Sequence, residues 1–498
     1  LLVTPQAANK TMGQGGFQEV EQMNLFKDMV CYQEEVRDPS RMAEVLNRVI
    51  EKAFRGSAPA QINVPRDYWT QVIDIDLPPI VRFERQGGGK EAIEKAAKLL
   101  SDAKFPVILS GAGVVIGDAI EDCKKIAEKL DAPVCNGYQH NDSFPGSHPL
   151  AVGPLGYNGS KAGMELISKA DVVLALGTRL NPFSTLPGYG IDYWPKDATI
   201  IQVDMNPDRI GLTKKVTVGI CGDAKMVSQQ ILEKLSPTAG DNGRDERKNL
   251  IHQTKSAWLQ TLTSLDHEDD DPGTVWNKEA RERDSDRMSP RQAWRAIQSG
   301  MPENAIISSD IGNNCAIGNA YPTFEKPRKY LAPGLFGPCG YGFPSILGAK
   351  IGCPDTPVIG FAGDGAFGIS MNEMSSCARE EWPAITMVIF RNYQWGAEKR
   401  NSILWFDDNF IGTELDPELS YAKVANACGL KGVAVKTMEE TTTAIKQSCE
   451  DQKKGITTFI EVILNQELGE PFRRDAMKKP VQVAGIDKND MKPQKGLI

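Results

Sequence analysis

Clusters of cysteine or histidine are missing from this 498-residue sequence. The closest two of its ten cysteines, Cys123 and Cys135, are 135 − 123 = 12 positions apart, so no CxxC unit is present for zinc or dithiol chemistry. The four histidines offer little for a metal site or a catalytic triad, and His140, in a polar loop, is best interpreted as structural. We therefore expect reduced, mostly buried thiols in a cytoplasmic enzyme.

A surplus of positive charge is missing as well. Lysine and arginine total 57 against 65 acidic residues, a formal net charge of −8, which gives no broad cationic field for nucleic-acid phosphates. The most apolar stretches are broken by glycine or are shorter than the ~20 residues that a membrane helix needs. These absences disfavour nucleic-acid binding and a membrane span. The 41% hydrophobic and 24% charged content predicts a globular protein of roughly three domains.

Alternating strand and helix patterns predict an α/β protein whose parallel sheets are covered by helices. Residues 1–75 hold too few such patterns to close a sheet alone. The alternation is regular over 90–235 and resumes over 289–475. Residues 236–288 are polar and charged and predict a solvated connection, and 476–498 form a C-terminal tail. The strands expected in the two regular blocks are 107–109, 172–175, 200–203, 305–309, 357–361, 384–390 and 458–462.

The densest chemical signal follows the strand expected at 357–361. Gly363-Asp364-Gly365 lets the backbone approach a ligand and exposes N–H groups, and a helix is expected at 371–381. Asp364 offers a carboxylate oxygen of the kind that Mg²⁺ takes beside phosphate oxygens and water. A lone GDG is also a common tight turn with its aspartate as N-cap, so the motif alone leaves both interpretations open.

Two further loops are expected at the same edge. The strand at 384–390 runs into Arg391 and Asn392, and the strand at 305–309 runs into a loop, Asp310 to Asn314, with a glycine and two amides. A right-handed crossover between parallel neighbours would bring Asp364 and Asn392 to one crevice. The three loops would then converge on one diphosphate and its metal.

This combination resembles the fingerprint of thiamin-diphosphate enzymes. The glycine-rich run 335–344 looks like the segment that these enzymes place beside the aminopyrimidine ring. Within them, segments 11–18, 392–400 and 470–477 look most like the sulfoacetaldehyde acetyltransferase family. The resemblance spans essentially the whole chain. It implies a three-domain architecture, with part of the pyrimidine domain in the first block, then a central domain and a pyrophosphate domain.

That family converts 2-sulfoacetaldehyde and phosphate to acetyl phosphate and sulfite, so the resemblance implies an acyltransferase of taurine and sulfonate degradation that uses thiamin-diphosphate carbanion chemistry. Acetolactate synthase, a carboligase that acts on pyruvate, is the alternative because its domain order and core motifs are similar. Two departures from it are Cys339, where it usually has methionine, and Arg391, which replaces the first asparagine of its usual pair. A second alternative is a non-catalytic fragment that binds the cofactor without turnover.

Carried onto this sequence, the resemblance implies a metal and cofactor site. Asp364 and Asn392 would hold Mg²⁺ through their side chains, and Gln394 through its main-chain carbonyl. Cys339 would lie under the bent cofactor. The residues implied to line the diphosphate, besides Asp364 and Asn392, are Gly312, Asn313, Asn314, Gly363, Gly365 and Ala366.

The pyrimidine domain would contribute the remaining catalytic parts. Phe17 and Gln18 would approach the thiazolium ring. The chain opens at Leu1 with neither a methionine nor a signal-peptide pattern, which predicts a start inside this domain. The activating glutamate that these enzymes hold against N1′ is then expected before Leu1 and is absent from the sequence. Glu19 and Glu21 lie on the wrong loop to replace it.

Both implied substrates are anions, so a pocket with cationic groups is expected. Arg391, Lys399 and Arg400 lie close to Asn392 and are the candidates, with an ordinary structural or surface charge as the alternative for each. The implied partners are the two small molecules, 2-sulfoacetaldehyde and phosphate, with no nucleic acid and no membrane. The resemblance implies a homodimer or homotetramer.

Overall fold

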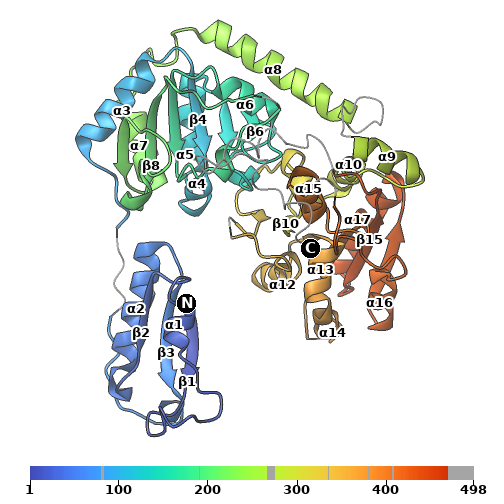
Figure 1. Ribbon diagram of the computed structural model, residues 1–498. Helices are drawn as coiled ribbons and strands as arrows, with labels where there is room; N and C mark the ends of the chain where they lie inside the picture. Colours follow the sequence, from blue (N-terminus) through green and yellow to red (C-terminus); the bar gives the residue numbers. More distant parts are fainter. Residues whose placement is uncertain are drawn as a thin grey trace, which may run out of the picture. The chain divides into compact units, whose positions relative to one another are not determined.

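The computed structural model describes residues 1–79, 84–189, 191–265, 275–334, 336–379, 381–405 and 409–468. These residues form three parallel sheets with helices around them, as Figure 1 shows. The predicted α/β class is therefore confirmed. Two compact units are present, Leu1–Arg85 and Gln86–Ile498, and the finer division into domains stays a prediction. The predicted tail 476–498 and the motif at 470–477 lie outside the described residues.

The first unit is a three-stranded sheet in the order β1-β3-β2, so the expectation that residues 1–75 are too poor in strands to form a sheet is wrong. The central strand β3 is buried along its whole length, whereas its two neighbours are partly exposed and only β2 is polar. Val45 and Val49 of α2 pack with Ile62 of β3. The elements are β1 (Leu2–Gln6), α1 (Gln22–Phe26), β2 (Tyr32–Glu35), α2 (Met42–Gly56) and β3 (Ala60–Pro65).

The second unit begins with a six-stranded sheet in the order β6-β5-β4-β7-β8-β9. The inner strands are short runs of Val, Ile and Leu that are buried on both faces, as a parallel sheet between helix layers requires. The strands are β4 (Pro106–Ser110), β5 (Val134–Asn136), β6 (Ala151–Pro154), β7 (Val172–Leu176), β8 (Thr199–Asp204) and β9 (Val218–Cys221). The helices are α3 (Lys90–Asp102), α4 (Ala112–Ile116), α5 (Ile120–Leu130), α6 (Lys161–Ile167) and α7 (Ala224–Lys234).

The helices α8 (Arg244–Leu265) and α9 (Val275–Arg283) occupy the segment predicted as a solvated connection. The structure corrects that expectation for α8. Arg247 is buried and donates hydrogen bonds to the carbonyls of Leu130 at 2.7 Å and Asp131 at 3.0 Å. Trp258 and Leu262 are buried in a hydrophobic cluster with residues of the following sheet. The segment therefore contains a helix with one buried side, which is more than a solvated connection.

A second six-stranded parallel sheet follows, in the order β11-β10-β12-β13-β15-β14. The helix expected at 371–381 starts earlier, because β12 turns straight into α13 at Asp364, and it breaks into short pieces after Ser370. The strands are β10 (Ile306–Ser309), β11 (Tyr330–Leu331), β12 (Val358–Gly363), β13 (Thr386–Arg391), β14 (Lys431–Val435) and β15 (Thr458–Ile463). The helices are α10 (Pro290–Gly300), α11 (Asn313–Ile317), α12 (Gly342–Gly352), α13 (Asp364–Ser370), α14 (Met374–Cys377), α15 (Gly396–Trp405), α16 (Tyr421–Ala427) and α17 (Met438–Gln452).

Buried polar side chains join the two six-stranded sheets. Asn141, in the 3₁₀ helix η3 (Asn141–Ser143), donates to the carbonyls of Asn319 at 2.9 Å and Pro322 at 3.0 Å. Asp142 accepts from the backbone N–H groups of Lys329 at 3.0 Å and Tyr330 at 3.3 Å, beside β11. Among the described residues, no helix is both long enough and apolar enough to cross a membrane.

Candidate functional site

Three loops meet at one edge of the last sheet. β10, β12 and β13 are neighbouring parallel strands, so their carboxyl ends lie side by side. Asp310 follows β10, Asp364 follows β12 and Asn392 follows β13. All three side chains are about 1% exposed. The three loops therefore converge as the sequence predicted, and their polar side chains form a buried cluster at this edge.

Both carboxylate oxygens of Asp364 are held in place. One accepts from the N–H of Gly365 at 3.0 Å, and the other from the N–H of Tyr393 at 2.7 Å and from Arg391 Nη1 at 3.1 Å. Burial raises the pKa of Asp364 to about 6, against the opposing effect of the Arg391 charge. The orientation of the carboxylate is thus fixed. Its charged form is costly in this buried position without neighbouring cations, of which Arg391 is one.

Arg391, predicted as a substrate-binding cation, is enclosed by protein groups. Its guanidinium also pairs with Glu461 at 3.6 Å and donates to the carbonyl oxygens of Asp416 and, at 2.9 Å, Leu419. Its side chain is 1% exposed. The structure therefore places Arg391 beside Asp364 as a structural charge, the alternative to the substrate-binding role.

Lys399 is likewise a supporting group. Its ammonium donates to Oε1 of Gln394 at 3.1 Å and pairs with Glu414, and burial lowers its pKa. The Gln394 side chain also donates to the carbonyl of Gln466 at 2.9 Å. These contacts fix the segment that contains Gln394, whose main-chain carbonyl the family resemblance assigns to the metal. Lys399 is 1% exposed.

Arg400 is the candidate cation that reaches the diphosphate loop. Its Nη1 lies 3.4 Å from Oδ1 of Asn313, and its guanidinium stacks over the ring of Tyr157 at 4.7 Å. Burial lowers its pKa to about 10, so it stays charged at neutral pH. Arg400 therefore joins the central part of the chain to the loop after β10.

Two of the predicted glycines have different reasons to be glycine. Gly312 has φ of +132°, and a Cβ added there would meet open space, as a close backbone approach to a ligand requires. A Cβ on Gly365 would instead lie 2.8 Å from the ring of Trp395. Packing against that indole, which the sequence did not reveal, therefore requires glycine at 365. Gly363 also faces open space, and Ala366 is buried beside it.

The sequence overlooked the role of Asp310. Its carboxylate accepts from the backbone N–H groups of Ile311 at 2.8 Å, Gly340 at 3.1 Å and Gly342 at 2.6 Å. Burial raises its pKa, and these hydrogen bonds oppose that shift. Asp310 thereby anchors the glycine-rich loop that presents the exposed Cys339. An aspartate directly after a buried strand was the available signal.

The residues predicted from the pyrimidine domain lie in the first unit. Phe17 is 83% exposed, and Gln18 adopts a φ of 61°. Glu19 accepts from the N–H groups of Gly13 and Gly16, which lower its pKa, so it holds its own loop. The approach of Phe17 and Gln18 to the thiazolium ring stays a prediction.

The donor set fits a divalent cation that shares a diphosphate. Asp364 and Asn392 offer side-chain oxygens, the ligands that hard cations prefer. Two other polar atoms there, the donor Nδ2 of Asn392 and the acceptor Oδ1 of Asn314, are buried without a hydrogen-bond partner. In the part of the chain that the structure describes, no group of three His, Cys, Asp or Glu side chains could hold a metal. A cation here therefore needs oxygens from its diphosphate. The open space at Gly312 and Gly363 fits that ligand.

The GxG turn at Gly111 and Gly113 in the central sheet is structural. A Cβ on either glycine would lie 2.6 or 2.7 Å from the backbone of Gly177. The loops after β4 and β7 therefore pack backbone against backbone. These two glycines therefore serve the packing of a strand-to-helix turn.

We expect His140 to make the protein sensitive to acid. Burial lowers the pKa of His140 to about 4 from an ordinary value of 6.5. The folded state therefore favours the neutral ring, and this stabilisation is complete above pH 6.5 and is lost as the pH falls toward 4. The loss should be about 2–3 kcal/mol in the free energy of unfolding.

This loss is measured by urea unfolding between pH 7 and pH 4.5, with His140→Gln expected to flatten the pH dependence. His252→Gln, at an exposed position, is the control and should keep the native slope. Equal slopes for native protein and His140→Gln would assign the acid sensitivity to other groups.

The comparisons with known proteins match this architecture. Residues 93–235 match the family described as thiamine pyrophosphate enzyme, central domain, and residues 310–462 match its C-terminal TPP binding domain. The fold is similar to that of benzoylformate decarboxylase from Polynucleobacter necessarius, with a TM-score of 0.73 over 94% of this chain and 82% of that one, at 20% identity. The fold and the site thus define a thiamin-diphosphate enzyme.

The sequence relatives are more specific. The chain is 78% identical to a probable sulfoacetaldehyde acetyltransferase of Rhizobium meliloti, over 99% of this chain and 84% of the relative. It is 75% identical to the sulfoacetaldehyde acetyltransferase of Roseovarius nubinhibens, over 99% and 82%. A probable acetolactate synthase large subunit of Methanococcus aeolicus is 28% identical, over 90% and 74%. The chain belongs to the sulfoacetaldehyde acetyltransferase family.

Proposed function

We propose that this protein converts 2-sulfoacetaldehyde and phosphate to acetyl phosphate and sulfite. The observation that carries this proposal is the 68–78% identity, over 99% of the chain, with three relatives that bear the sulfoacetaldehyde acetyltransferase name. Identity with acetolactate synthase large subunits is 26–28%. That gap supports the acyltransferase over the pyruvate carboligase.

The proposed metal site uses groups that the fold already fixes. Asp364 and Asn392 would hold Mg²⁺ through side-chain oxygens, and Gln394 would hold it through its main-chain carbonyl. Arg391 keeps the Asp364 carboxylate aimed at the site, since it bonds one oxygen at 3.1 Å. Lys399 holds the Gln394 side chain in place through a 3.1 Å hydrogen bond to its Oε1. A hard cation held this way neutralises a diphosphate.

The proposed cofactor site lies over this metal. Thiamin diphosphate, when bound, supplies a nucleophilic carbon for addition to the aldehyde carbonyl. Asp310 positions the loop on which Cys339 sits, and Cys339 is the side chain of that loop that would lie beside the cofactor. Phe17 and Gln18 of the first unit stay the residues proposed to approach the thiazolium ring. The backbone and side chains proposed to line the diphosphate are those of Gly312, Asn313, Asn314, Gly363, Gly365 and Ala366.

Arg400 is the group we propose for attraction of the anionic substrates. It touches Asn313 on the diphosphate loop, and it stays charged at neutral pH. A guanidinium suits both a sulfonate and a phosphate because it presents a planar fork of N–H donors. Lys399 and Arg391 are bonded to carboxylates instead.

We also propose a cytoplasmic homodimer or homotetramer. Large apolar side chains of the first unit support association, since Phe17, Leu25 and Met29 are 83%, 59% and 61% exposed. All ten cysteines are free, which suits a reducing compartment. Sedimentation of the purified protein measures the assembly.

The proposed function is tested by product analysis on the purified protein with thiamin diphosphate and Mg²⁺. We expect sulfite release from 2-sulfoacetaldehyde, formation of acetyl phosphate in equal amount, and dependence of both on phosphate. Pyruvate alone should give acetolactate at a rate lower by about 100-fold or more. Efficient acetolactate formation without sulfite release would establish the carboligase instead. Cofactor binding without turnover of either substrate would establish a binding protein.

A further inference from the structure

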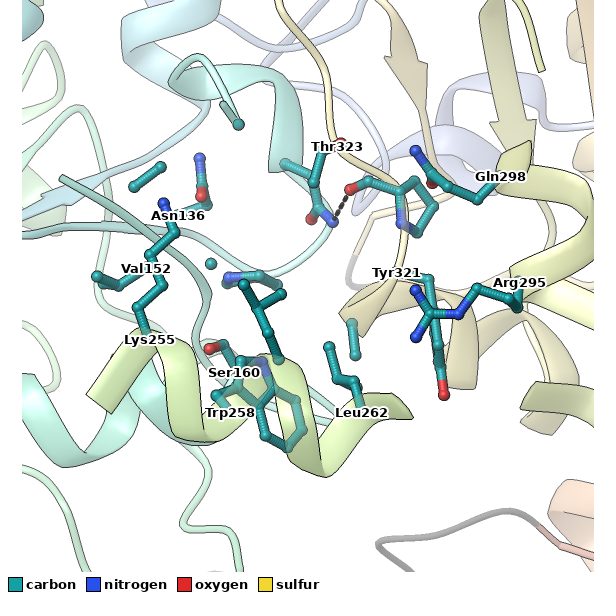
Figure 2. Close-up of a pocket in the computed structure, with 18 residues that line it drawn as sticks. Asn136, Val152, Ser160, Lys255, Trp258, Leu262, Arg295, Gln298, Tyr321 and Thr323 are labelled. Atoms are coloured by element: carbon teal, nitrogen blue, oxygen red, sulfur yellow. Dashed lines mark hydrogen bonds between the residues drawn. The ribbon is translucent and has the colours of Figure 1, made fainter. Parts of the chain in front are cut away.

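A cavity of about 260 Å³ lies where the central sheet, α8 and the last sheet meet. Its walls come from β6, from α8, from α10 and from the segment 320–323 that follows the 3₁₀ helix η7 (Gly318–Ala320). Figure 2 shows Lys255 and Arg295 on opposite sides of the opening, with Trp258 and Leu262 below. The cavity is separate from the diphosphate crevice, and no role described above uses it.

The charge of the cavity is one-sided. Its described lining contains Lys255 and Arg295 and no Asp or Glu. The Lys255 ammonium is half-buried, and within the described chain its hydrogen bond goes to the carbonyl of His148 at 2.9 Å, with no carboxylate within ion-pair distance. Burial lowers the pKa of Lys255. A half-buried cation is costly without a counter-ion, so the cavity suits an anion.

The acidic groups beside this cavity are already engaged. Glu128 and Asp131 line a neighbouring groove that Lys255 also borders. Glu128 lies 3.2 Å from His148, and Asp131 pairs with Arg244 at 2.9 Å. Neither serves as a counter-ion for Lys255.

A buried acceptor in the cavity wall also lacks a donor. Asn141 is 5% exposed, and its amide nitrogen donates to the carbonyls of Asn319 and Pro322, which fixes the orientation of the amide. Its Oδ1 is buried without a hydrogen-bond partner. Oε1 of Gln298, another wall residue, is also buried without one. The occupant should therefore donate a hydrogen bond.

We infer that this cavity binds a small organic anion that carries a hydrogen-bond donor on an apolar body. The anionic group pairs with Lys255, the donor meets Oδ1 of Asn141, and the body lies against Trp258 and Tyr321. A 150 Å³ apolar cavity holds benzene, so 260 Å³ accommodates roughly a dozen non-hydrogen atoms. This inference does not depend on the proposed reaction.

The test is calorimetric titration of the full-length protein, saturated with thiamin diphosphate and Mg²⁺ so that the catalytic crevice is filled. The probe is 3-phenyllactate, which has a carboxylate, a hydroxyl and a phenyl ring. We expect saturable binding of one molecule per chain at concentrations up to about 10 mM. The neutral 3-phenyl-1,2-propanediol should bind at least about tenfold more weakly, and 3-phenylpropanoate, which lacks the hydroxyl, should also bind more weakly.

Lys255→Gln should weaken binding of 3-phenyllactate by about tenfold or more, whereas Lys248→Gln should not change it. Lys248 is a matched control because it lies two turns earlier on the same helix and pairs with Asp131 at 3.4 Å. Circular dichroism checks that both variants fold, and the analogue series gives the same test on the native protein. Absence of saturable binding, equal affinity for the neutral diol, or binding that survives Lys255→Gln would overturn the inference.

Discussion

Asp364→Ala is expected to abolish Mg²⁺-dependent binding of thiamin diphosphate and the release of sulfite. The change removes a proposed metal ligand whose two oxygens are aligned by Gly365, Tyr393 and Arg391. It also leaves the buried Arg391 charge directly where a cation should bind. We expect the affinity for the cofactor to fall by at least about 100-fold. Titration of thiamin diphosphate at fixed Mg²⁺ by equilibrium dialysis measures it.

The control for this variant is Asp355→Ala. Asp355 is exposed and precedes β12, so it lies at the opposite end of the strand that leads to Asp364. Cofactor affinity should be unchanged there. If Asp364→Ala kept its affinity at low metal concentration, the metal would have to be held by other groups.

Arg391→Met should lower the free energy of unfolding by about 3–5 kcal/mol, the usual cost of removing one partner of a buried ion pair. The side chains of Arg391, Asp364 and Glu461 are 1%, 1% and 2% exposed. Without the guanidinium, two buried carboxylates lose their cation, and the carbonyl oxygens of Asp416 and Leu419 lose a donor. Urea unfolding followed by circular dichroism measures the change.

Arg379→Met is the matched control, because Arg379 is exposed and should contribute little. Arg391→Lys should recover part of the loss, since it restores a charge without the planar fork. A change below about 1 kcal/mol in Arg391→Met would show that the buried network is not held together by this arginine.

The sequence predicted the edge of the last sheet because its signals are local. The strands around 359 and 388 are unbroken apolar runs, and polar residues follow each directly, so parallel pairing was enough to bring Asp364 and Asn392 together. The family followed from three segments, 11–18, 392–400 and 470–477, of which 392–400 lies at this edge. The relatives at 68–78% identity bear that out.

What could not be predicted depends on contacts distant in sequence. From the sequence, Arg391 looks like an exposed cation at the end of a strand. In the structure the carbonyl oxygens of Asp416 and Leu419 accept from it, and no residue near 391 in the sequence indicates these contacts. Gly365 belongs to a ligand-binding motif, yet Trp395 is what crowds it. The strands β1 and β2 were missed because they are short and partly exposed and form a sheet only by pairing with β3.

The polar junction between the two six-stranded sheets shapes how the chain folds as it is made. Asp142 accepts from the N–H of Lys329, a residue 187 positions later. At 5–20 residues per second, roughly 10–40 s pass on the ribosome between the synthesis of these two residues. During that time Asn141 and Asp142 remain hydrated, because their later partners do not yet exist. The central sheet therefore leaves the ribosome with the Asn141 and Asp142 side chains of η3 unpaired by protein. Their set of hydrogen-bond partners is complete only after β11 has been translated.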